Sequence, residues 1–521
     1  MRKILYLALF MSLIGWSSCI EDDSSLGGDL DTITITGMDE EDAISVVSYT
    51  GVNLGDLVKP EITSTYPEEQ LTYAWYLFDQ NASEDTYQNY QISSERVLDY
   101  EVNLKSGTYA LVFEVTSQTD GYVELARTSV QTSTPYSRGF YILKETTGGD
   151  TELDIYNGTD FLTDRIAFST GSSLSGKPYN ISVLYSGEYI NPDENKTDVA
   201  NMVHVSTEDG NRYIGFRTED LTKAFEGASL FYSEEMGTDE YPAVFANSIF
   251  NNFYFSNTGV RVYQCGVSMG SSSPTTGRMG YAVGNGASRF VQISSYTDGF
   301  IYWSNADHEI QNVDYNAIAC NPVPYEGATA YPNDLECLAS GYNTIISSAW
   351  FLCEQPSTGD RYLFLATYRS ISKVIKLDPS LHLAQAEKIG GNGRTASYIY
   401  CIDDNKLYAY SLSTGGEQVV TLHGIPVSET LDFVTNQYLN FSSMLGTAYN
   451  FDNLIVGTRS GNSYKLYFYG EEQMNGGMPI AEAENVVEGE GRVHAVRYVA
   501  PMNNVSGMYL SFGNVPFPIS D

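Results

Sequence analysis

Short apolar strands separated by glycine turns dominate the hydrophobic pattern of this chain. Residues 136–157, with the sequence YSRGFYILKETTGGDTELDIYN, are typical of an apolar strand, a glycine turn and a second strand. Similar strand pairs recur downstream, for example in residues 397–412 and 454–469. Helical periodicity is almost absent, so the pattern predicts an all-β fold.

The length of this repetitive region predicts its architecture. Residues 135–521 span about 385 positions, which is too long for a single β-sandwich. Seven or eight blades of about 45–55 residues each fit this length, as in a β-propeller. No Gly-His…Trp-Asp signature marks the repeat, so the sequence leaves the blade number open between seven and eight.

A smaller β-domain precedes the repetitive region in residues 32–134. Residues 71–78, LTYAWYLF, alternate between two faces, and residues 107–116, GTYALVFEVT, predict a further strand. This Tyr-x-Trp strand followed by Gly-x-Tyr-x-Leu resembles an immunoglobulin-like sandwich of the PKD (polycystic-kidney-disease) type. Because many β-sandwiches bury a tryptophan on a central strand, we interpret Trp75 as a core residue.

The net charge of the chain limits the classes of molecule that it can bind. The 521-residue chain has 65 acidic side chains against 28 lysines and arginines, with a net charge of −37. A surface this acidic repels the phosphate backbone, so we predict no nucleic-acid partner. The composition is typical of a protein that stays soluble at a crowded cell surface.

The N-terminus has the pattern of a secretory signal. Residues 1–18 contain two cations, an apolar run and small residues before Cys19. The run of about 12 residues is too short to span a bilayer, which takes about 20. Cys19 resembles the cysteine of a bacterial lipobox, although Trp16 stands where leucine is commoner. We predict that residues 1–18 are a lipoprotein signal peptide and that residues 19–31 form a tether lipidated at Cys19. The alternative is an ordinary signal peptide with an incidental cysteine.

An acidic cluster follows this cysteine. Glu21, Asp22 and Asp23 resemble the signal that exports lipoproteins to the cell surface in Bacteroidota-type bacteria. Together with LTYAWYLF and GFYILKETTGGDTELDIYN, these features resemble the PKD-like family lipoproteins over essentially the whole chain. The resemblance implies a lipid-anchored outer-membrane protein that faces the exterior beside a nutrient-import transporter. It transfers no catalytic residue to this chain.

Motifs for catalysis or metal binding are incomplete. Ser268 lies in a Gly-x-Ser-x-Gly pattern, but the following Ser-Ser-Ser-Pro cannot begin the helix that a nucleophile elbow needs. Residues 171–177, GSSLSGK, are followed by proline where a phosphate-binding loop has serine or threonine. His308-Glu309 lacks the second histidine of a zinc-protease helix. We predict no catalytic site, no metal and no cofactor.

Cysteine spacing also disfavours a metal site. Five cysteines remain besides Cys19, and none forms a Cys-x-x-Cys pair. Cys320 and Cys337 could close a loop in an oxidising compartment. The apolar segments FLC and YIYC, which end at Cys353 and Cys401, favour buried free thiols on strands instead.

Aromatic side chains are the best candidates for ligand contact. Tyr302 and Trp303 lie together in the segment FIYW, and Trp350 is the other tryptophan of the large region. Aromatic faces stack on sugar rings or peptide side chains, so a cluster on one propeller face would form a binding platform. The alternative is that both tryptophans fill space between blades.

Three functional hypotheses follow. The first is a non-catalytic module that captures glycan or peptide for an outer-membrane import system. The second, by analogy with other propellers, is a polysaccharide hydrolase or lyase. The third is an adhesive or structural surface protein. With 65 acidic residues, the sequence alone cannot identify the carboxylate pair that a glycoside hydrolase would need.

Overall fold

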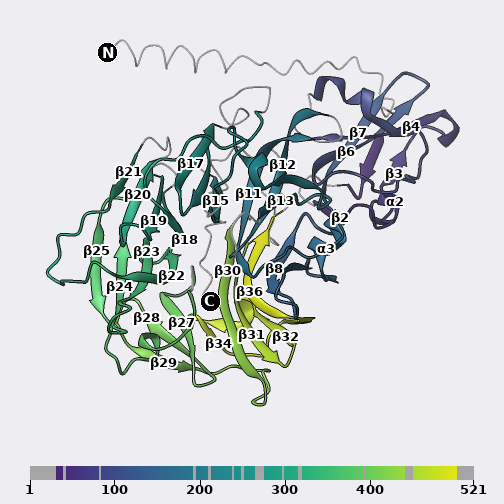
Figure 1. Cartoon of the computed structure of the whole chain (residues 1–521). Helices are drawn as coiled ribbons and strands as arrows, with labels where there is room; N and C mark the ends of the chain where they lie inside the picture. The colour runs from purple at the N-terminus through teal and green to yellow at the C-terminus, as the bar shows by residue number, and fades with distance from the viewer. Residues whose placement is uncertain are drawn as a thin grey trace, which may run out of the picture. The chain divides into compact units, whose positions relative to one another are not determined.

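Strands prevail in the structure, a computed structural model (Figure 1). The structure describes residues 31–38, 43–80, 84–191, 195–208, 213–237, 240–247, 251–264, 275–295, 299–314, 319–391, 394–440 and 450–500. Across these stretches, no helix has the length and apolar character needed to cross a membrane. The chain divides into two compact units. The first holds the described residues up to Ile44 together with Asn53–Glu101 and Tyr109–Val130, and the second holds Ser45–Val52, Val102–Thr108 and the residues from Gln131 onward.

The N-terminal β-structure contains two sheets, as expected for a PKD-like sandwich. One has the strand order β2-β7-β6-β4-β5, and the other pairs β1 with β3 in antiparallel fashion. The strands are β1 (Ile33–Thr36), β2 (Ile44–Val47), β3 (Glu61–Ser64), β4 (Leu71–Asp79), β5 (Gln91–Ser93), β6 (Gly107–Ser117) and β7 (Val123–Ser133). Helical segments here are α2 (Leu54–Leu57), η2 (Glu68–Gln70) and η3 (Glu84–Tyr90).

Trp75 occupies the core position expected for it. Its side chain is fully buried on β4, opposite Phe113 on β6. The two rings stack with their centroids 4.2 Å apart, and the indole N–H donates a hydrogen bond to the Glu95 carbonyl at 3.0 Å. A buried tryptophan needs both the apolar contact and the polar partner, and Trp75 has both.

The second unit contains seven consecutive sheets of three or four strands among the described residues. The first is built from β10 (Phe161–Leu162), β9 (Thr151–Tyr156), β8 (Gly139–Glu145) and β36 (Arg492–Val499), in that order. The second sheet contains β11 (Pro178–Asn191), β12 (Lys196–Thr207), β13 (Tyr213–Arg217) and β14 (Lys223–Glu226), and the third contains β15 (Pro242–Asn247), β16 (Asn251–Ser256) and β17 (Gly259–Gln264). The fourth contains β18 (Ala287–Ser295), β19 (Gly299–Ser304), β20 (Glu309–Asp314) and β21 (Cys320–Pro322), and the fifth contains β22 (Glu336–Asn343), β23 (Ser348–Glu354), β24 (Arg361–Ala366) and β25 (Ile371–Lys376). The sixth contains β26 (Lys388–Gly391), β27 (Tyr398–Asp403), β28 (Lys406–Ser411) and β29 (Glu417–Val420), and the seventh contains β30 (Thr430–Asn440), β31 (Asn450–Ser460), β32 (Ser463–Tyr469) and β35 (Asn485–Glu490). Shorter segments are α3 (Arg165–Thr170), η4 (Gly227–Leu230), η5 (His382–Ala384), η7 (Glu471–Gln473), β33 (Met474–Asn475) and β34 (Met478–Pro479).

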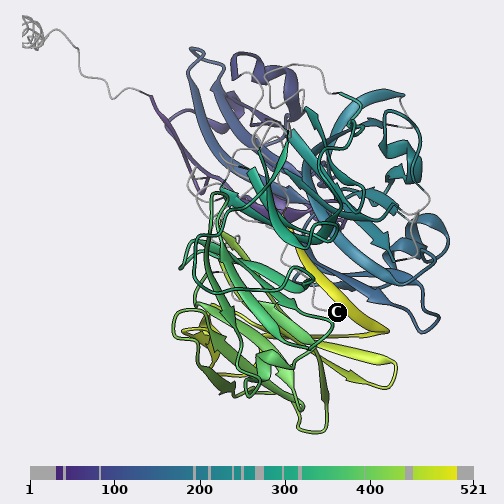
Figure 2. The ribbon, with the colours of Figure 1, turned by 60° about the vertical axis from the view of Figure 1, so that its left-hand side comes forward.

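These sheets form a β-propeller of seven blades. One edge strand of each blade contacts the corresponding edge strand of the next, in the order β11, β15, β18, β22, β26, β30 and β36, and β36 contacts β11 in turn. The ring closes because the C-terminal strand β36 pairs with β8, from the start of the unit. In Figure 2 the yellow strand β36 lies beside the blue strand β8. The sequence left seven or eight blades open, and strand pairing selects seven.

Burial on both faces explains the apolar runs that the sequence displays. A strand inside a propeller blade packs against the neighbouring blades on its two faces, so its residues need not alternate between apolar and polar. Every residue of β9, β19 and β24 is buried accordingly. Continuous runs such as GFIYWS and RYLFLA are therefore typical of this packing.

The described cysteines are free thiols, as expected. Cys353 and Cys401 are buried, whereas Cys320 and Cys337 are partly exposed. Cys320 lies on β21 and Cys337 on β22, in different sheets, so the loop closure considered for this pair is not formed. Cys337 instead lies directly opposite Cys353 across β22 and β23. Cys265 lies outside the described residues.

A buried histidine makes the stability of the propeller depend on pH. His204 on β12 stacks on Phe245 with a centroid distance of 3.9 Å, and its Nδ1 lies 2.6 Å from the Tyr213 hydroxyl. Burial lowers the pKa of His204 to about 3. Because the folded pKa lies below the unfolded value of about 6.5, neutral His204 stabilises the fold above that pH. This contribution is lost as the pH falls toward 3.

We therefore predict a shallower acid response after His204→Gln. Between pH 6 and pH 4, the wild-type unfolding free energy should fall by about 1.4 kcal/mol per pH unit more than that of the variant. Urea unfolding of both proteins at a series of pH values measures this difference. Equal slopes for the two proteins would contradict the assignment.

Candidate functional site

A cleft of about 470 Å³ lies between the first and last blades of the propeller. Its volume is within the range of small-ligand sites. Its lining residues are Arg138, Gly139, Phe140, Tyr156, Asn157, Gly158, Thr159, Phe451, Asn453, Phe468, Gly470, Glu471, Glu472, Glu484, Asn485 and Tyr498. The cleft lies where β8 begins and β36 ends, because Gly139 pairs with Val499 at that end of the two strands.

A row of aromatic side chains crosses the first blade at this level. Tyr498 on β36, Phe140 on β8, Tyr156 on β9 and Phe161 on β10 are successive partners in the strand register. Directly opposed residues in antiparallel strands place their side chains on the same face of the sheet. Strand pairing therefore assembles this row from residues far apart in the sequence.

The last blade completes the aromatic surface. Phe468 lies 4.9 Å from Phe140 and 5.4 Å from Tyr156, measured between ring centroids. Phe451 lies 4.7 Å from Tyr498, at nearly a right angle to it. Phe140, Tyr156 and Phe468 are buried, whereas Phe451 and Tyr498 are partly exposed. Phe451 and Tyr498 are thus the rings that a ligand would contact.

Gly139 allows the backbone to approach closely at the edge of this row. Its φ of +125° favours glycine, and a Cβ atom there would lie 2.5 Å from the Tyr156 carbonyl oxygen. A larger residue would therefore separate β8 from β9 beside Phe140. This glycine explains the sequence Arg-Gly-Phe at the start of the blade.

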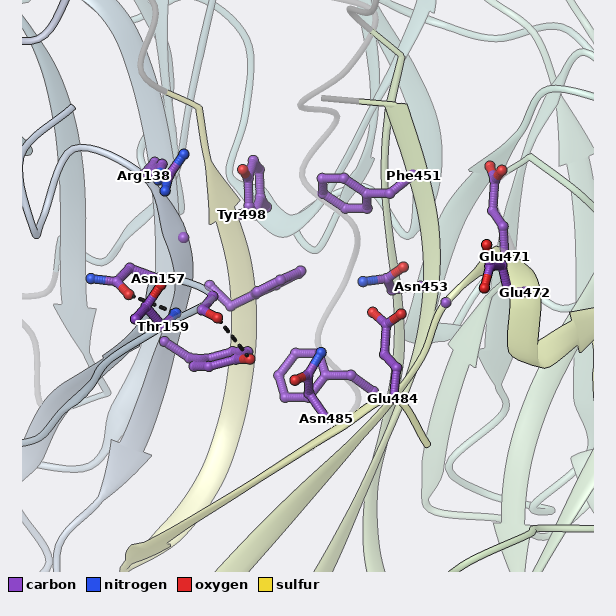
Figure 3. A pocket seen from close by; sticks show the side chains of 16 residues that line it. Arg138, Asn157, Thr159, Phe451, Asn453, Glu471, Glu472, Glu484, Asn485 and Tyr498 are labelled. Atoms are coloured by element: carbon purple, nitrogen blue, oxygen red, sulfur yellow. Dashed lines mark hydrogen bonds between the residues drawn. The ribbon is translucent and has the colours of Figure 1, made fainter. Parts of the chain in front are cut away.

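Polar groups line the two walls of the cleft (Figure 3). Arg138, Asn157 and Thr159 lie on one wall, and Asn453, Glu471, Glu472 and Glu484 lie on the other. Asn157 is held in place because its Oδ1 accepts hydrogen bonds from the backbone N–H groups of Thr159 and Asp160, at 3.0 and 2.7 Å. The Asn157 amide also donates to the Pro135 carbonyl at 3.3 Å.

Burial and neighbouring charges act on the acidic side chains of the cleft. Burial raises the pKa of Glu484 above its ordinary value, a hydrogen bond with Asn485 opposes the rise, and the charge of Glu472 adds to it. Burial and the Glu484 charge also raise the pKa of Tyr156. Glu471 has a long ion pair of 3.8 Å with Arg394.

The arrangement suits the binding of a polyhydroxylated ligand. Aromatic faces stack on the apolar faces of sugar rings, and carboxylate and amide oxygens accept hydrogen bonds from hydroxyl groups. The three carboxylates belong to one wall, while the opposite wall presents Arg138, Asn157 and Thr159. Glycoside hydrolysis uses two carboxyl groups that flank the scissile bond.

The aromatic residues predicted as a ligand platform are core residues, which corrects that prediction. Tyr302 and Trp350 are 0% exposed and Trp303 is 1% exposed, so a ligand cannot reach them. Tyr302 and Trp303 lie on β19, and Trp350 lies on β23. The physical reason is that central blade strands are covered on both faces. The alternative, that these residues fill space between blades, agrees with their positions.

Most other sequence motifs lie in turns and strands. Residues 171–177 form a loop after α3, and His308 belongs to a turn before β20 begins at Glu309. Neither segment has the helix that its catalytic or nucleotide-binding interpretation would require. Ser268 lies outside the described residues, as do Cys19 and the acidic cluster of Glu21, Asp22 and Asp23. In the described part of the chain, no group of three or more His, Cys, Asp and Glu residues is arranged to hold a metal ion.

Sequence reasoning missed the aromatic cleft. Phe140 and Tyr156 lie in the strand pair that the sequence singles out, but their cleft partners Phe451, Phe468 and Tyr498 follow some 300 residues later. Locally, each is an ordinary apolar residue of a strand. Pairing the first strand of the propeller with its last strand, so that Phe140 lies opposite Tyr498, would have revealed the row.

Comparisons with known proteins found one family match and several distant structural similarities. Residues 25–178 match the PKD-like family, so the match extends from the small β-domain into the first blade. Curated proteins gave no match. A quinonprotein alcohol dehydrogenase-like protein from Bacteroides thetaiotaomicron is similar with a TM-score of 0.39 and 13% identity, covering 91% of this chain and 100% of that one. The Dos1 propeller is similar with a TM-score of 0.30 and 10% identity, covering 75% and 82% of the two chains. Residues 25–178 are thus similar to the PKD-like family, and the β-propeller continues beyond the matched region.

Proposed function

We propose that this protein is a surface-anchored, non-catalytic module that captures neutral glycan chains in the aromatic cleft. The single observation that carries the proposal is the aromatic row of the first blade, completed by Phe451 and Phe468. The partly exposed rings of Phe451 and Tyr498 supply stacking surfaces. The side chains on the walls supply hydrogen-bond acceptors for hydroxyl groups.

The side chains that line the aromatic cleft favour a glycan ligand over a peptide ligand. A peptide groove offers backbone hydrogen-bonding groups along a strand edge or an apolar groove for a helix. This cleft instead combines ring faces with carboxylate and amide side chains, as sugar recognition requires.

The proposed location rests on the N-terminal sequence. Cys19 would carry the lipid anchor, and Glu21, Asp22 and Asp23 would direct the protein to the outer face of the outer membrane. Several acyl chains hold a protein firmly on a membrane. The resemblance to PKD-like lipoproteins supports a place beside a nutrient-import transporter. Cys19→Ser should release the protein from the membrane fraction, and retention of that variant would refute the anchor.

Glycan binding can be tested with matched variants of exposed aromatic residues. Purified protein is titrated calorimetrically with a panel of neutral oligosaccharides, and reducing ends are assayed in the same samples. Phe451→Ala and Tyr498→Ala should each weaken binding about tenfold, equivalent to about 1.4 kcal/mol of lost stacking. Tyr281→Ala is the control, because Tyr281 is 93% exposed and does not line the cleft.

Each outcome of this titration decides a part of the proposal. Binding without new reducing ends, lost in the two cleft variants alone, supports the capture module. New reducing ends would replace it with a hydrolase or lyase. Equal losses in Tyr281→Ala, or no binding to any oligosaccharide in the panel, would refute glycan capture by the cleft.

A further inference from the structure

A second cavity lies at the opposite end of the β8–β36 strand pair. It measures about 640 Å³, and a groove of about 500 Å³ shares Glu145, Lys177 and Arg492 with it. We call the two together the basic mouth. Glu145 pairs with Arg492 at this end, whereas Gly139 pairs with Val499 at the aromatic cleft. Six residue steps along β8 separate the two ends, which corresponds to about 20 Å.

The propeller topology brings cationic residues to this mouth. Lys177 immediately precedes β11, Lys388 begins β26 and Arg492 begins β36, while Arg289 lies near the start of β18. All four strands belong to the ring of seven edge strands, in which each strand contacts the next. Because these strands begin at the same end of the propeller, residues at their starts converge there.

The charge of the lining differs sharply from that of the chain. Lys177, Arg289, Arg361, Lys388, Arg459 and Arg492 line the basic mouth, together with Glu145, Glu208, Glu354 and Glu387. Six of the 28 lysines and arginines therefore lie here, against four of the 65 acidic residues. A protein with a net charge of −37 thus presents a cavity whose lining carries two more cations than carboxylates. Chance placement of the charges would give an excess of carboxylates.

Several of these cations are held in fixed positions. Arg361 donates to the Leu383 and Ala386 carbonyls at 3.0 and 2.6 Å, and its Nε lies 2.8 Å from Glu354. Arg492 contacts Asp432 at 3.1 Å. A guanidinium that is already ordered loses little conformational entropy when it binds a ligand.

Arg289 is fixed by a different set of contacts. Its guanidinium donates to the Tyr179 carbonyl at 3.2 Å and lies 5.3 Å from the centroid of the Tyr179 ring. It also lies 5.5 Å from the Phe290 ring, and Phe290 lines the cavity. A planar guanidinium beside an aromatic ring is a preorganised partner for planar anions.

We infer that the basic mouth binds an acidic sugar, meaning a polyhydroxylated ligand that carries carboxylate or sulfate groups. The lysines and arginines bind the anionic group, and guanidinium groups match the geometry of such oxyanions. The glutamates of the lining accept hydrogen bonds from sugar hydroxyls. The cavity volume lies within the range of small-ligand sites. This site does not depend on the aromatic cleft, so either proposal can fail without the other.

The test uses variants that remove charge without disturbing the core. Lys177 and Arg459 are exposed residues of the mouth, so Lys177→Gln and Arg459→Gln should fold normally. Lys223→Gln is the control, because Lys223 on β14 is also exposed and does not line the basic mouth. Each purified protein is titrated with a uronate trisaccharide, its carboxyl-reduced neutral counterpart and a sulfated trisaccharide, at low and high salt.

We expect the wild type to bind an acidic trisaccharide at least tenfold more tightly than the neutral counterpart. Affinity should fall at high salt and weaken three- to tenfold in Lys177→Gln and Arg459→Gln, but stay unchanged in Lys223→Gln. A preference for the uronate assigns a carboxylate ligand, and a preference for the sulfated sugar assigns a sulfate ligand. Equal affinity for acidic and neutral sugars, or no binding of either acidic sugar, would overturn the inference. Phe451→Ala should leave this binding intact, which separates the result from that of the aromatic cleft.

Discussion

Lys144→Met is expected to destabilise the propeller by about 3–5 kcal/mol, the usual effect of removing one partner of a buried ion pair. Lys144 on β8 and Asp154 on β9 are 2.8 Å apart, with only 3% and 0% of their side chains exposed. Burial lowers the pKa of Lys144, but the charges of Asp154 and Asp164 outweigh it and raise that pKa overall. Burial raises the pKa of Asp154, and the Lys144 charge opposes that rise, so the variant leaves a buried carboxyl group without its cationic partner.

This ion pair also links the two ends of the ring. Tyr464 on β32, in the last blade, donates its hydroxyl proton to Asp154 in the first blade at 2.6 Å. Asp154 further accepts a hydrogen bond from the backbone N–H of Asp164 at 2.8 Å. Loss of the lysine therefore affects a network that joins the first and last blades.

Urea unfolding measures the effect of Lys144→Met, and an exposed pair supplies the control. Lys376 forms an ion pair of 2.6 Å with Asp360, but both side chains are solvent-accessible. Lys376→Met should leave the unfolding midpoint nearly unchanged, because surface ion pairs contribute little to stability. The double variant Lys144→Met/Asp154→Asn removes the uncompensated charge and keeps an acceptor for Tyr464, so it should recover part of the lost stability. A Lys144→Met protein as stable as Lys376→Met would contradict the role of the buried pair.

Trp350→Ala is expected to cost about 3–5 kcal/mol as well, because a fully buried tryptophan leaves a large cavity when it is truncated. Trp350 lies on β23 with 0% exposure. Two glycines leave the space that the indole ring of Trp350 fills. A Cβ atom on Gly341, which lies directly opposite on β22, would come within 2.7 Å of the indole ring. A Cβ atom on Gly391, in the next blade, would also come within 2.7 Å.

A double-mutant cycle tests this packing directly. Gly391→Ala should cost about 1–3 kcal/mol in the wild-type background, because it forces the indole out of its position. In the Trp350→Ala background, the same substitution should cost much less, since the clash is gone. Tyr281→Ala, at a position 93% exposed, is the control for loss of an aromatic residue. An equal cost of Gly391→Ala in both backgrounds would show that the glycine acts through something other than Trp350.

The fold class followed from local sequence patterns. Runs such as GFYILKE and RYLFLA, separated by glycine turns, predict buried strands wherever they occur, because burial on both faces requires continuous apolar residues. Chain length then separated a propeller from a single sandwich. Seven blades could be distinguished from eight only when β36 was seen to pair with β8, since neither strand differs locally from its neighbours.

The prediction of a ligand site from aromatic residue type was wrong because the largest aromatic side chains are buried. Trp303 and Trp350 are the largest apolar side chains of the propeller, and the free energy gained by burying them places them between blades. The exposed ring faces belong to Phe451 and Tyr498, which lie at strand ends beside the cleft. Size and residue type therefore predicted burial better than they predicted ligand contact.

The amino-acid sequence by itself determined the all-β class, the PKD-like sandwich with Trp75 in its core, the propeller that follows and the burial of Cys353 and Cys401. These properties depend on local periodicity and side-chain hydrophobicity. Tertiary structure alone decided the blade number, the aromatic row and the basic mouth. Each of these is created when the two ends of the unit pair through β8 and β36. Hydrogen bonds between strands some 350 residues apart leave no local signal in the sequence.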